Sequence, residues 1–244
     1  MSRSGAGADP ARDTGPGDGR GHAARWPRAV AAGISRVAGA QLVASFATRA
    51  PLVALTVDDG PHPRTTPGLL DALASAGARA TFFVIGAHGE RCPELLRDVA
   101  SGGHELGNHL WQGSASVLLP AVEFDRDLAA THALLAAHGP VRWFRPGSGW
   151  FTPRMLRSGA RLGYRCALGS PGLATARYPD PTRVAFRFAA RCRAGDVVVL
   201  HEGAPHRAAV ADVVRALVAE LARRGLQATT LSELAARSTA PRPA

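Results

Sequence analysis

Two adjacent carboxylates follow directly on an apolar run. The run Leu52–Val57 is mainly apolar, and Asp58 and Asp59 come next, before a Gly-Pro pair. This pattern predicts a buried strand that ends in a turn, so that both acids leave the core together. Adjacent carboxylates repel one another unless a cation or a proton lies between them. One acid on a metal and the other as a base would make a metal-assisted hydrolase, whereas a solvated turn is the simpler interpretation.

Three further polar side chains stand a short distance after an apolar run. They are His109, Arg145 and His201. In a barrel of parallel strands, the loops that follow the carboxyl ends of the strands meet on one face. The sequence therefore predicts that the two histidines and the arginine converge on the two acids.

These residues are held by elements that alternate along the chain from Pro51 onward. The predicted strands are Leu52–Val57, Ala80–Ile85, Glu105–Leu106, Val141–Phe144, Arg165–Leu168, Val197–Leu200 and Ala228–Thr230. The predicted helices are Thr66–Ala76, Pro93–Ser101, Ala121–Ala137, Pro153–Leu162, Arg183–Arg191 and Ala208–Arg224. Alternation of this kind predicts an α/β fold with a parallel sheet, and a closed barrel is the expected form.

The two ends of the chain differ from this central part. Residues 1–24 lack apolar periodicity and are expected to form a disordered tail. Residues 25–50 are expected to form a short amphipathic helix or a linker. This stretch is too interrupted by polar residues and glycines to span a membrane, and it lacks the features of a secretion signal. The main domain is expected over residues 51–237, followed by a second disordered tail at 238–244. We expect a cytoplasmic or membrane-peripheral protein.

Composition argues against two other classes of protein. The formal net charge is +10, and all 29 basic residues are arginine, but these arginines are scattered along the chain. A nucleic-acid-binding protein would gather them on one face, so we expect no nucleic acid partner. The three cysteines are an odd number without CxxC spacing, which argues against a disulfide framework and against a cysteine zinc site.

The order and spacing of six motifs resemble the NodB-type polysaccharide deacetylases, the family 4 carbohydrate esterases. The motifs are Asp58-Asp59-Gly60-Pro61, Thr81–Gly86, Gly103–His109, Arg145-Pro146-Gly147, Val197–Glu202 and Thr230–Leu234. The resemblance implies a distorted (β/α)7-type barrel, the NodB homology domain. It also implies a divalent metal, usually zinc, and a carbohydrate substrate from which an N-acetyl group is removed.

The resemblance also implies a role for each polar residue. Asp58 would be the general base and His201 the general acid, while Asp59 and His109 would bind the metal. Arg145 would keep Asp58 ionised and oriented. These roles suit amide hydrolysis, because a metal polarises the carbonyl group while a base takes the proton of the attacking water. A protonated histidine then supplies the proton without which the amine could not leave.

The resemblance fails at one metal ligand. The family's second metal-binding histidine lies four residues after the first, and that position is Gly113 here. Three interpretations follow: another ligand or water completes the site, the metal is weaker or different, or the barrel is a metal-free carbohydrate-binding pseudoenzyme. Gln112, His62 and His88 are candidate ligands, although loop histidines are usually solvated. His104 is predicted to be structural.

Other departures are typical of a divergent sub-branch of the family. Arg145 is followed by Pro-Gly-Ser-Gly-Trp, and the aspartate that tunes the catalytic histidine in the family is not recognisable; Asp180 is the nearest candidate. Pro146, Trp150 and Trp111 are predicted to bind the sugar, because aromatic faces suit apolar sugar faces, although tryptophan is as often part of a core. The sequence thus predicts a metal-dependent deacetylase of an N-acetylated sugar polymer or glycoside, with the pseudoenzyme as the alternative.

Overall fold

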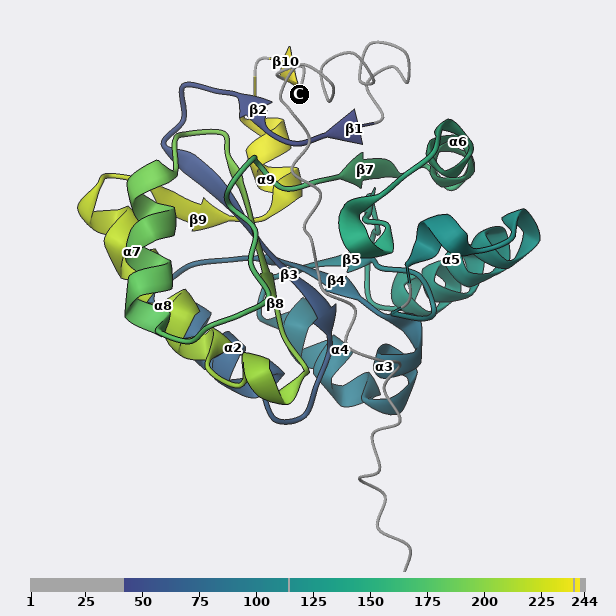
Figure 1. Cartoon of the computed structure of the whole chain (residues 1–244), viewed down its shortest axis with the longest axis horizontal. Helices are drawn as coiled ribbons and strands as arrows, with labels where there is room; N and C mark the ends of the chain where they lie inside the picture. The colour runs from purple at the N-terminus through teal and green to yellow at the C-terminus, as the bar shows by residue number, and fades with distance from the viewer. Residues whose placement is uncertain (1–41, 114, 239, 242–244) are drawn as a thin grey trace, which may run out of the picture.

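A parallel sheet of eight strands forms the centre of the protein (Figure 1). The structure is a computed structural model, and it describes residues 42–113, 115–238 and 240–241. The strand order is β1-β7-β6-β5-β4-β3-β8, and β9 pairs with the first residues of β3. These strands are β1 (Leu42–Val43), β3 (Leu52–Gly60), β4 (Thr81–Val84), β5 (Glu105–Asn108), β6 (Trp143–Phe144), β7 (Arg165–Ala167), β8 (Val197–His201) and β9 (Gln227–Thr229).

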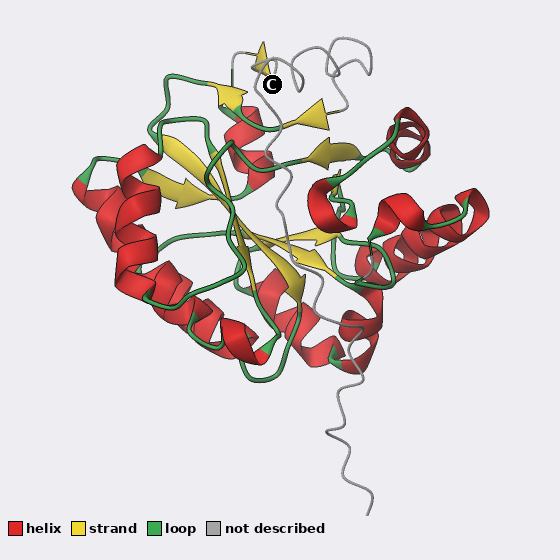
Figure 2. Cartoon of the chain, viewed as in Figure 1, coloured by secondary structure: helices red, strands yellow, loops and turns green. Residues whose placement is uncertain are grey.

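Helices surround this sheet (Figure 2). They are α2 (Thr66–Ser75), α3 (Gly86–Arg91), α4 (Pro93–Ser101), α5 (Ala121–Ala136), α6 (Pro153–Arg161), α7 (Pro181–Arg191), α8 (Val210–Arg223) and α9 (Leu231–Ala236). Helix α8 packs against α7 and α2. Its apolar stripe recurs at helical spacing and is buried, as expected for a helix that covers a sheet: Val210, Val213, Val214, Leu217, Val218 and Leu221.

The predicted α/β architecture is confirmed. Every strand and helix predicted from Pro51 onward is present, with bounds that differ by at most three residues. The short helices α3 and α9 were not predicted, since six residues are too few for a clear apolar period. β3 is longer than its apolar run because it continues through both aspartates to Gly60.

The amphipathic helix or linker predicted over residues 25–50 is wrong for residues 42–47, where the structure has two short strands. Leu42 pairs with Cys166, which adds β1 to the edge of β7. Strand β2 (Phe46–Ala47) pairs with β10 (Ala240–Pro241), so the tail predicted at 238–244 also contains a paired strand. Exposed backbone groups at a sheet edge outweigh the weak helical preference of this stretch. Residues 1–41, including the tail predicted at 1–24, lie outside the described residues.

The barrel is distorted at the seam between β1 and β8. Instead of a ladder, a single bridge joins Ser45 to Asp196 among the described residues. Ser170 reinforces the seam: its hydroxyl donates to the carbonyl of Ala44 at 2.9 Å and accepts from the amide of Val197 at 3.0 Å. No helix in the described part of the chain is long and apolar enough to cross a membrane.

Candidate active site

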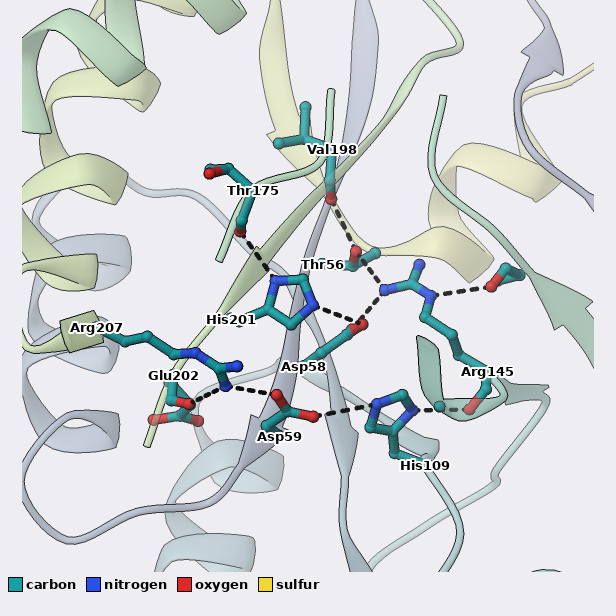
Figure 3. Close-up of polar contacts among 12 residues, drawn as sticks. Thr56, Asp58, Asp59, His109, Arg145, Thr175, Val198, His201, Glu202 and Arg207 are labelled. Carbon is teal, nitrogen blue, oxygen red and sulfur yellow. Dashed lines mark hydrogen bonds and ion pairs between the residues drawn. The ribbon is translucent and has the colours of Figure 1, made fainter. Parts of the chain in front are cut away.

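The polar residues predicted from the sequence come together at the carboxyl ends of the strands (Figure 3). Asp58 and His201 are register partners on the neighbouring strands β3 and β8. His109 directly follows β5 and Arg145 directly follows β6. Because all these strands are parallel, their ends face the same way, and the side chains meet although the residues are far apart in sequence.

A bulge places both aspartates in the site. Consecutive residues of a regular strand point to opposite faces, so Asp58 and Asp59 could not both reach one site. The pairing of β3 with β4 shifts register between Asp58 and Gly60, and Asp59 adopts a φ of 73°. A bulge of this kind re-aims a side chain. The left-handed backbone is strained for a residue with a Cβ, and such strain gathers at functional sites.

Asp58 is buried and held by an arginine. One carboxylate oxygen accepts from Nη1 of Arg145 at 2.5 Å, and Asp58 is 3% exposed. The same Nη1 donates to the hydroxyl of Thr56, and Nε donates to the carbonyl of Ala167, both at 2.9 Å. The guanidinium also lies over the ring of Phe83, 4.0 Å from its centroid. Arg145 is therefore fixed from several sides and presents one charge to Asp58.

His201 faces the other oxygen of Asp58. Its Nε2 lies 3.8 Å from Oδ2 of Asp58. Its Nδ1 lies 2.9 Å from the carbonyl oxygen of Thr175, and a carbonyl can only accept, so Nδ1 carries a hydrogen. Tyr178 fixes the backbone here, because its hydroxyl donates to the carbonyl of His201 and accepts from the amide of His201. The nitrogen of His201 that can gain or lose a proton is thus Nε2, which lies on the side of Asp58.

Asp59 lies between a histidine and an arginine. Its Oδ1 is 3.2 Å from Nε2 of His109, and its Oδ2 is 2.5 Å from Nη1 of Arg207. His109 is oriented by the carbonyl oxygen of Arg145, 2.7 Å from its Nδ1. Arg207 also donates to the carbonyl of Glu202 at 2.9 Å.

The charges of this cluster set its protonation. Burial by itself would raise the pKa of Asp59, but the hydrogen bond and charge of His109, with the charges of His201 and Arg207, hold that pKa well below its ordinary value. Burial would lower the pKa of His109, whereas its hydrogen bond to Asp59 and the nearby carboxylates raise it above the ordinary value. The arrangement favours an ionised Asp59 beside a protonated His109.

The described residues do not fit a three-ligand zinc site. Asp59 and His109 are suitable donors, and a carbonyl on Nδ1 is a usual support for a metal-binding histidine. Catalytic zinc takes three protein ligands, however, and no group of three His, Cys, Asp or Glu residues in the described chain could hold a metal. Gly113 offers no side chain, and Arg207 already occupies the second oxygen of Asp59.

The other candidate ligands, His62, His88 and Gln112, lie outside this set. His88 is on α3, and its Nδ1 lies 2.8 Å from the backbone carbonyl of Asp59, so it supports the bulge rather than standing in solvent. His62 is half-buried and accepts from the amide of Arg64 at 3.2 Å, while Gln112 is exposed. His104 is structural as predicted: it is buried, it accepts from the amide of Ala80, and burial lowers its pKa to about 4.

Three residues of the site were missed in the sequence, and one candidate was wrong. The first is Thr175, which acts through its backbone carbonyl, a group that every residue has. The others are Tyr178, which acts through its hydroxyl, and Arg207, which is one arginine among many. None of these groups leaves a motif that sequence analysis could recognise. Asp180 does not contact His201; it caps α7, where its side chain accepts from the amide of Arg183 at 2.9 Å. The carbonyl of Thr175 supports His201 instead.

The predicted sugar-binding residues differ in exposure. Pro146 is buried directly after Arg145, whereas Trp150 is 46% exposed after the short helix η3 (Gly147–Gly149). Trp111 is half-buried against the start of α3, where a Cβ on Gly86 would meet its ring. Their contact with a sugar stays a prediction.

Glu202 anchors the loop beneath the site. It is fully buried, and one oxygen accepts from the hydroxyls of Thr65 and Thr66, each at 2.7 Å. The other oxygen is buried without a partner, and a Cβ on Gly60 would clash with it. Burial raises the pKa of Glu202 to about 7, against the two threonine hydrogen bonds and with the help of the Asp59 charge.

We expect Glu202→Gln to remove a pH-dependent loss of stability. The folded state holds the proton of Glu202 more tightly than the unfolded chain does. The pKa of this carboxyl is about 7 in the folded state and has its ordinary value of 4.5 in the unfolded chain. The protonated Glu202 therefore stabilises the fold below about pH 4.5, and this stabilisation is lost as the pH rises to about 7. Above about pH 7 the free energy of unfolding changes no further on account of Glu202. Urea unfolding should show the variant gaining on the natural protein by on the order of 3 kcal/mol across this window. Glu123→Gln, an exposed residue of α5, is the control, and a pH-independent difference for Glu202→Gln would contradict the prediction.

The chain belongs to the polysaccharide deacetylase family, whose sequence profile matches residues 46–167. A chitooligosaccharide deacetylase from Bradyrhizobium is 35% identical over 156 residues, which cover 63% of this chain and 71% of that protein. A peptidoglycan-N-acetylglucosamine deacetylase from Bacillus cereus is 28% identical over 191 residues, 75% of this chain and 87% of that protein. Deacetylases of this family generally use a divalent metal.

Solved structures show the same fold. The Bc1960 peptidoglycan N-acetylglucosamine deacetylase superposes with a TM-score of 0.74 at 22% identity, over 82% of this chain and 95% of that chain. A family 4 pseudoenzyme from Bacillus anthracis superposes with a TM-score of 0.72 at 20% identity, over 80% of this chain and 69% of that chain. At these identities the likeness concerns the fold alone, so the fold is shared by proteins with and without activity.

Proposed function

We propose that the protein is a hydrolase that removes the acetyl group from an N-acetylated carbohydrate, with Asp58 as general base and His201 as general acid. One observation carries the proposal: Asp58 and His201 face each other across paired strands, with Nε2 of His201 3.8 Å from Oδ2 of Asp58. Arg145 is the positioning residue, because it holds the other oxygen of Asp58.

The two groups divide the proton transfers of amide hydrolysis between them. Asp58 takes a proton from the water that attacks the acetamide carbon, and the carbon becomes tetrahedral with a negative oxygen. His201 then donates the proton at Nε2 to the amine nitrogen as the C–N bond breaks, which releases acetate and the free amino sugar. Arg145 holds the carboxylate of Asp58 in a fixed orientation, since its Nη1 donates a charge-assisted hydrogen bond to one of the two oxygens.

The substrate class rests on the relatives and on the site. The relatives named above act on peptidoglycan and on chitooligosaccharides, both of which carry N-acetyl groups. Trp150, exposed after η3, together with Trp111 and Pro146, would contact the sugar. Asp59 and His109 are the two metal donors that the family motifs supply, but Arg207 already binds Asp59, so neither proton transfer is routed through a metal. No group of three His, Cys, Asp or Glu side chains that could hold a metal occurs among the described residues.

A measurement of acetate release tests the proposal. The full chain is incubated with N-acetylated chitooligosaccharides and with peptidoglycan fragments, and released acetate is quantified. We expect His201→Gln to lower the rate by about a hundredfold, because glutamine cannot deliver a proton. His138→Gln, which alters a half-buried histidine after α5, is the control. An unchanged rate for His201→Gln would refute the assignment of the general acid.

A metal-free carbohydrate-binding pseudoenzyme is the second candidate. Arg207 on the carboxylate of Asp59 and the glycine at position 113 favour it, because both oppose tight metal binding. It predicts that the natural protein binds the oligosaccharides in calorimetry but releases no acetate. Acetate release above the Asp58→Asn background excludes it.

A further inference from the structure

We propose that Arg207 takes the electrostatic place of the divalent metal in this chain, so that a guanidinium rather than a metal ion faces the acyl oxygen. The inference rests on the proposed function for its catalytic consequence. The question of which cation binds Asp59, Arg207 or a metal ion, does not depend on that function and can be tested separately. The inference assigns a site role to a residue outside the family motifs.

The contacts of Arg207 define the position. Nη1 donates to Oδ2 of Asp59 at 2.5 Å and to the carbonyl of Glu202 at 2.9 Å. In Figure 3, Asp59 lies between Arg207 on one side and His109 on the other. The cation thus binds the carboxylate that the family uses as a metal ligand, on the oxygen that His109 leaves free.

Two features make Arg207 and a metal mutually exclusive. A divalent metal on Asp59 and His109 would bring two positive charges close to the guanidinium of Arg207, which binds the same carboxylate, and like charges at such short range in a partly buried site repel strongly. The third ligand that would offset this cost is missing, since Gly113 stands at that position. The missing third ligand and the guanidinium of Arg207 therefore both weaken metal binding at Asp59 and His109.

Arg207 is held in place but keeps a donor for a ligand. The residue ends the short helix η4 (Pro205–Arg207), and its amide donates to the carbonyl of Ala204 at 2.8 Å. Its side chain is 17% exposed. Nη2 makes no hydrogen bond within the described part of the chain and is not among the buried unpartnered atoms. A guanidinium fixed through Nη1 with Nη2 open is a preorganised donor for an oxygen that becomes negative.

Zinc binding tests the inference without reference to activity. The full chain and four variants are dialysed against zinc and then against buffer, and zinc is quantified by elemental analysis. The variants are Arg207→Gln, Gly113→His, the pair Gly113→His/Arg207→Gln, and the control Arg215→Gln, whose arginine pairs with Asp212 on the surface of α8. A histidine at 113 requires a shift of the Ile85 side chain, whose end lies 2.8 Å from the expected Cβ.

We expect that neither the natural protein nor Arg215→Gln binds a stoichiometric amount of zinc. We also expect at least tenfold tighter zinc binding in Gly113→His/Arg207→Gln than in Gly113→His, because the competing cation has been removed. Equal affinities in these two variants would overturn the inference, as would stoichiometric zinc in the natural protein that a chelator removes.

Acetate release then separates the two proposals. If the natural protein hydrolyses the sugars, a chelator should leave the rate unchanged, and Arg207→Gln should lower it by about a hundredfold. A rate that a chelator abolishes would overturn the role of Arg207 and leave the deacetylase function standing. No acetate release together with the expected zinc results would refute the function and leave Arg207 as the cation on Asp59.

Discussion

Asp58→Asn should lower acetate release by about a thousandfold or more, the largest loss of activity expected from a single substitution in this chain. An amide cannot accept the proton of the attacking water, and general base catalysis is worth about 10²–10⁴ in rate. Asparagine keeps an oxygen that can accept from Arg145, so the contact at 2.5 Å has a replacement and the fold should persist. Steady-state rates of acetate release at a saturating oligosaccharide concentration measure the effect.

A matched control separates the base from a general loss of charge. Asp71→Asn removes an exposed carboxylate from α2 and should leave the rate unchanged. Oligosaccharide binding by Asp58→Asn, followed by calorimetry, should stay within a fewfold of the natural protein. An Asp58→Asn rate within tenfold of the natural rate would show that another group takes the proton.

Arg145→Met should destabilise the fold by about 3–5 kcal/mol, the largest loss of stability that we predict. Removal of one partner of a buried ion pair leaves the other charge uncompensated, and Asp58 is 3% exposed. The variant also loses the hydrogen bonds to Thr56 and Ala167 and the contact with the ring of Phe83. Urea unfolding measures the change in the free energy of unfolding.

A double-mutant cycle isolates the ion pair from the other contacts. Arg145→Met should cost at least 1 kcal/mol less in an Asp58→Asn background than in the natural protein, because no buried charge is then left alone. Arg126→Met is the control: Arg126 is 72% exposed next to Asp127, and its loss should cost less than about 1 kcal/mol. Additive losses in the cycle would show that the packing of Arg145, rather than its charge, stabilises the site.

The sequence determined the elements and most of the polar residues that meet at their ends. Apolar runs of strand length and helical periodicity depend on local patterns, so the strands and helices predicted from Pro51 onward are all present. Asp58, Asp59, His109, Arg145 and His201 were placed correctly because parallel strands end at the same side of a sheet.

The tertiary structure alone decided what those residues contact. The ion pair of Asp59 with Arg207 joins residues 148 positions apart, and one arginine among 29 carries no local mark. The support of His201 comes from the carbonyl of Thr175, a group that every residue has. The pairing of β1 with β7 overrode a weak helical pattern in the same way. Local patterns determine which elements form, whereas long-range packing determines which cation faces Asp59.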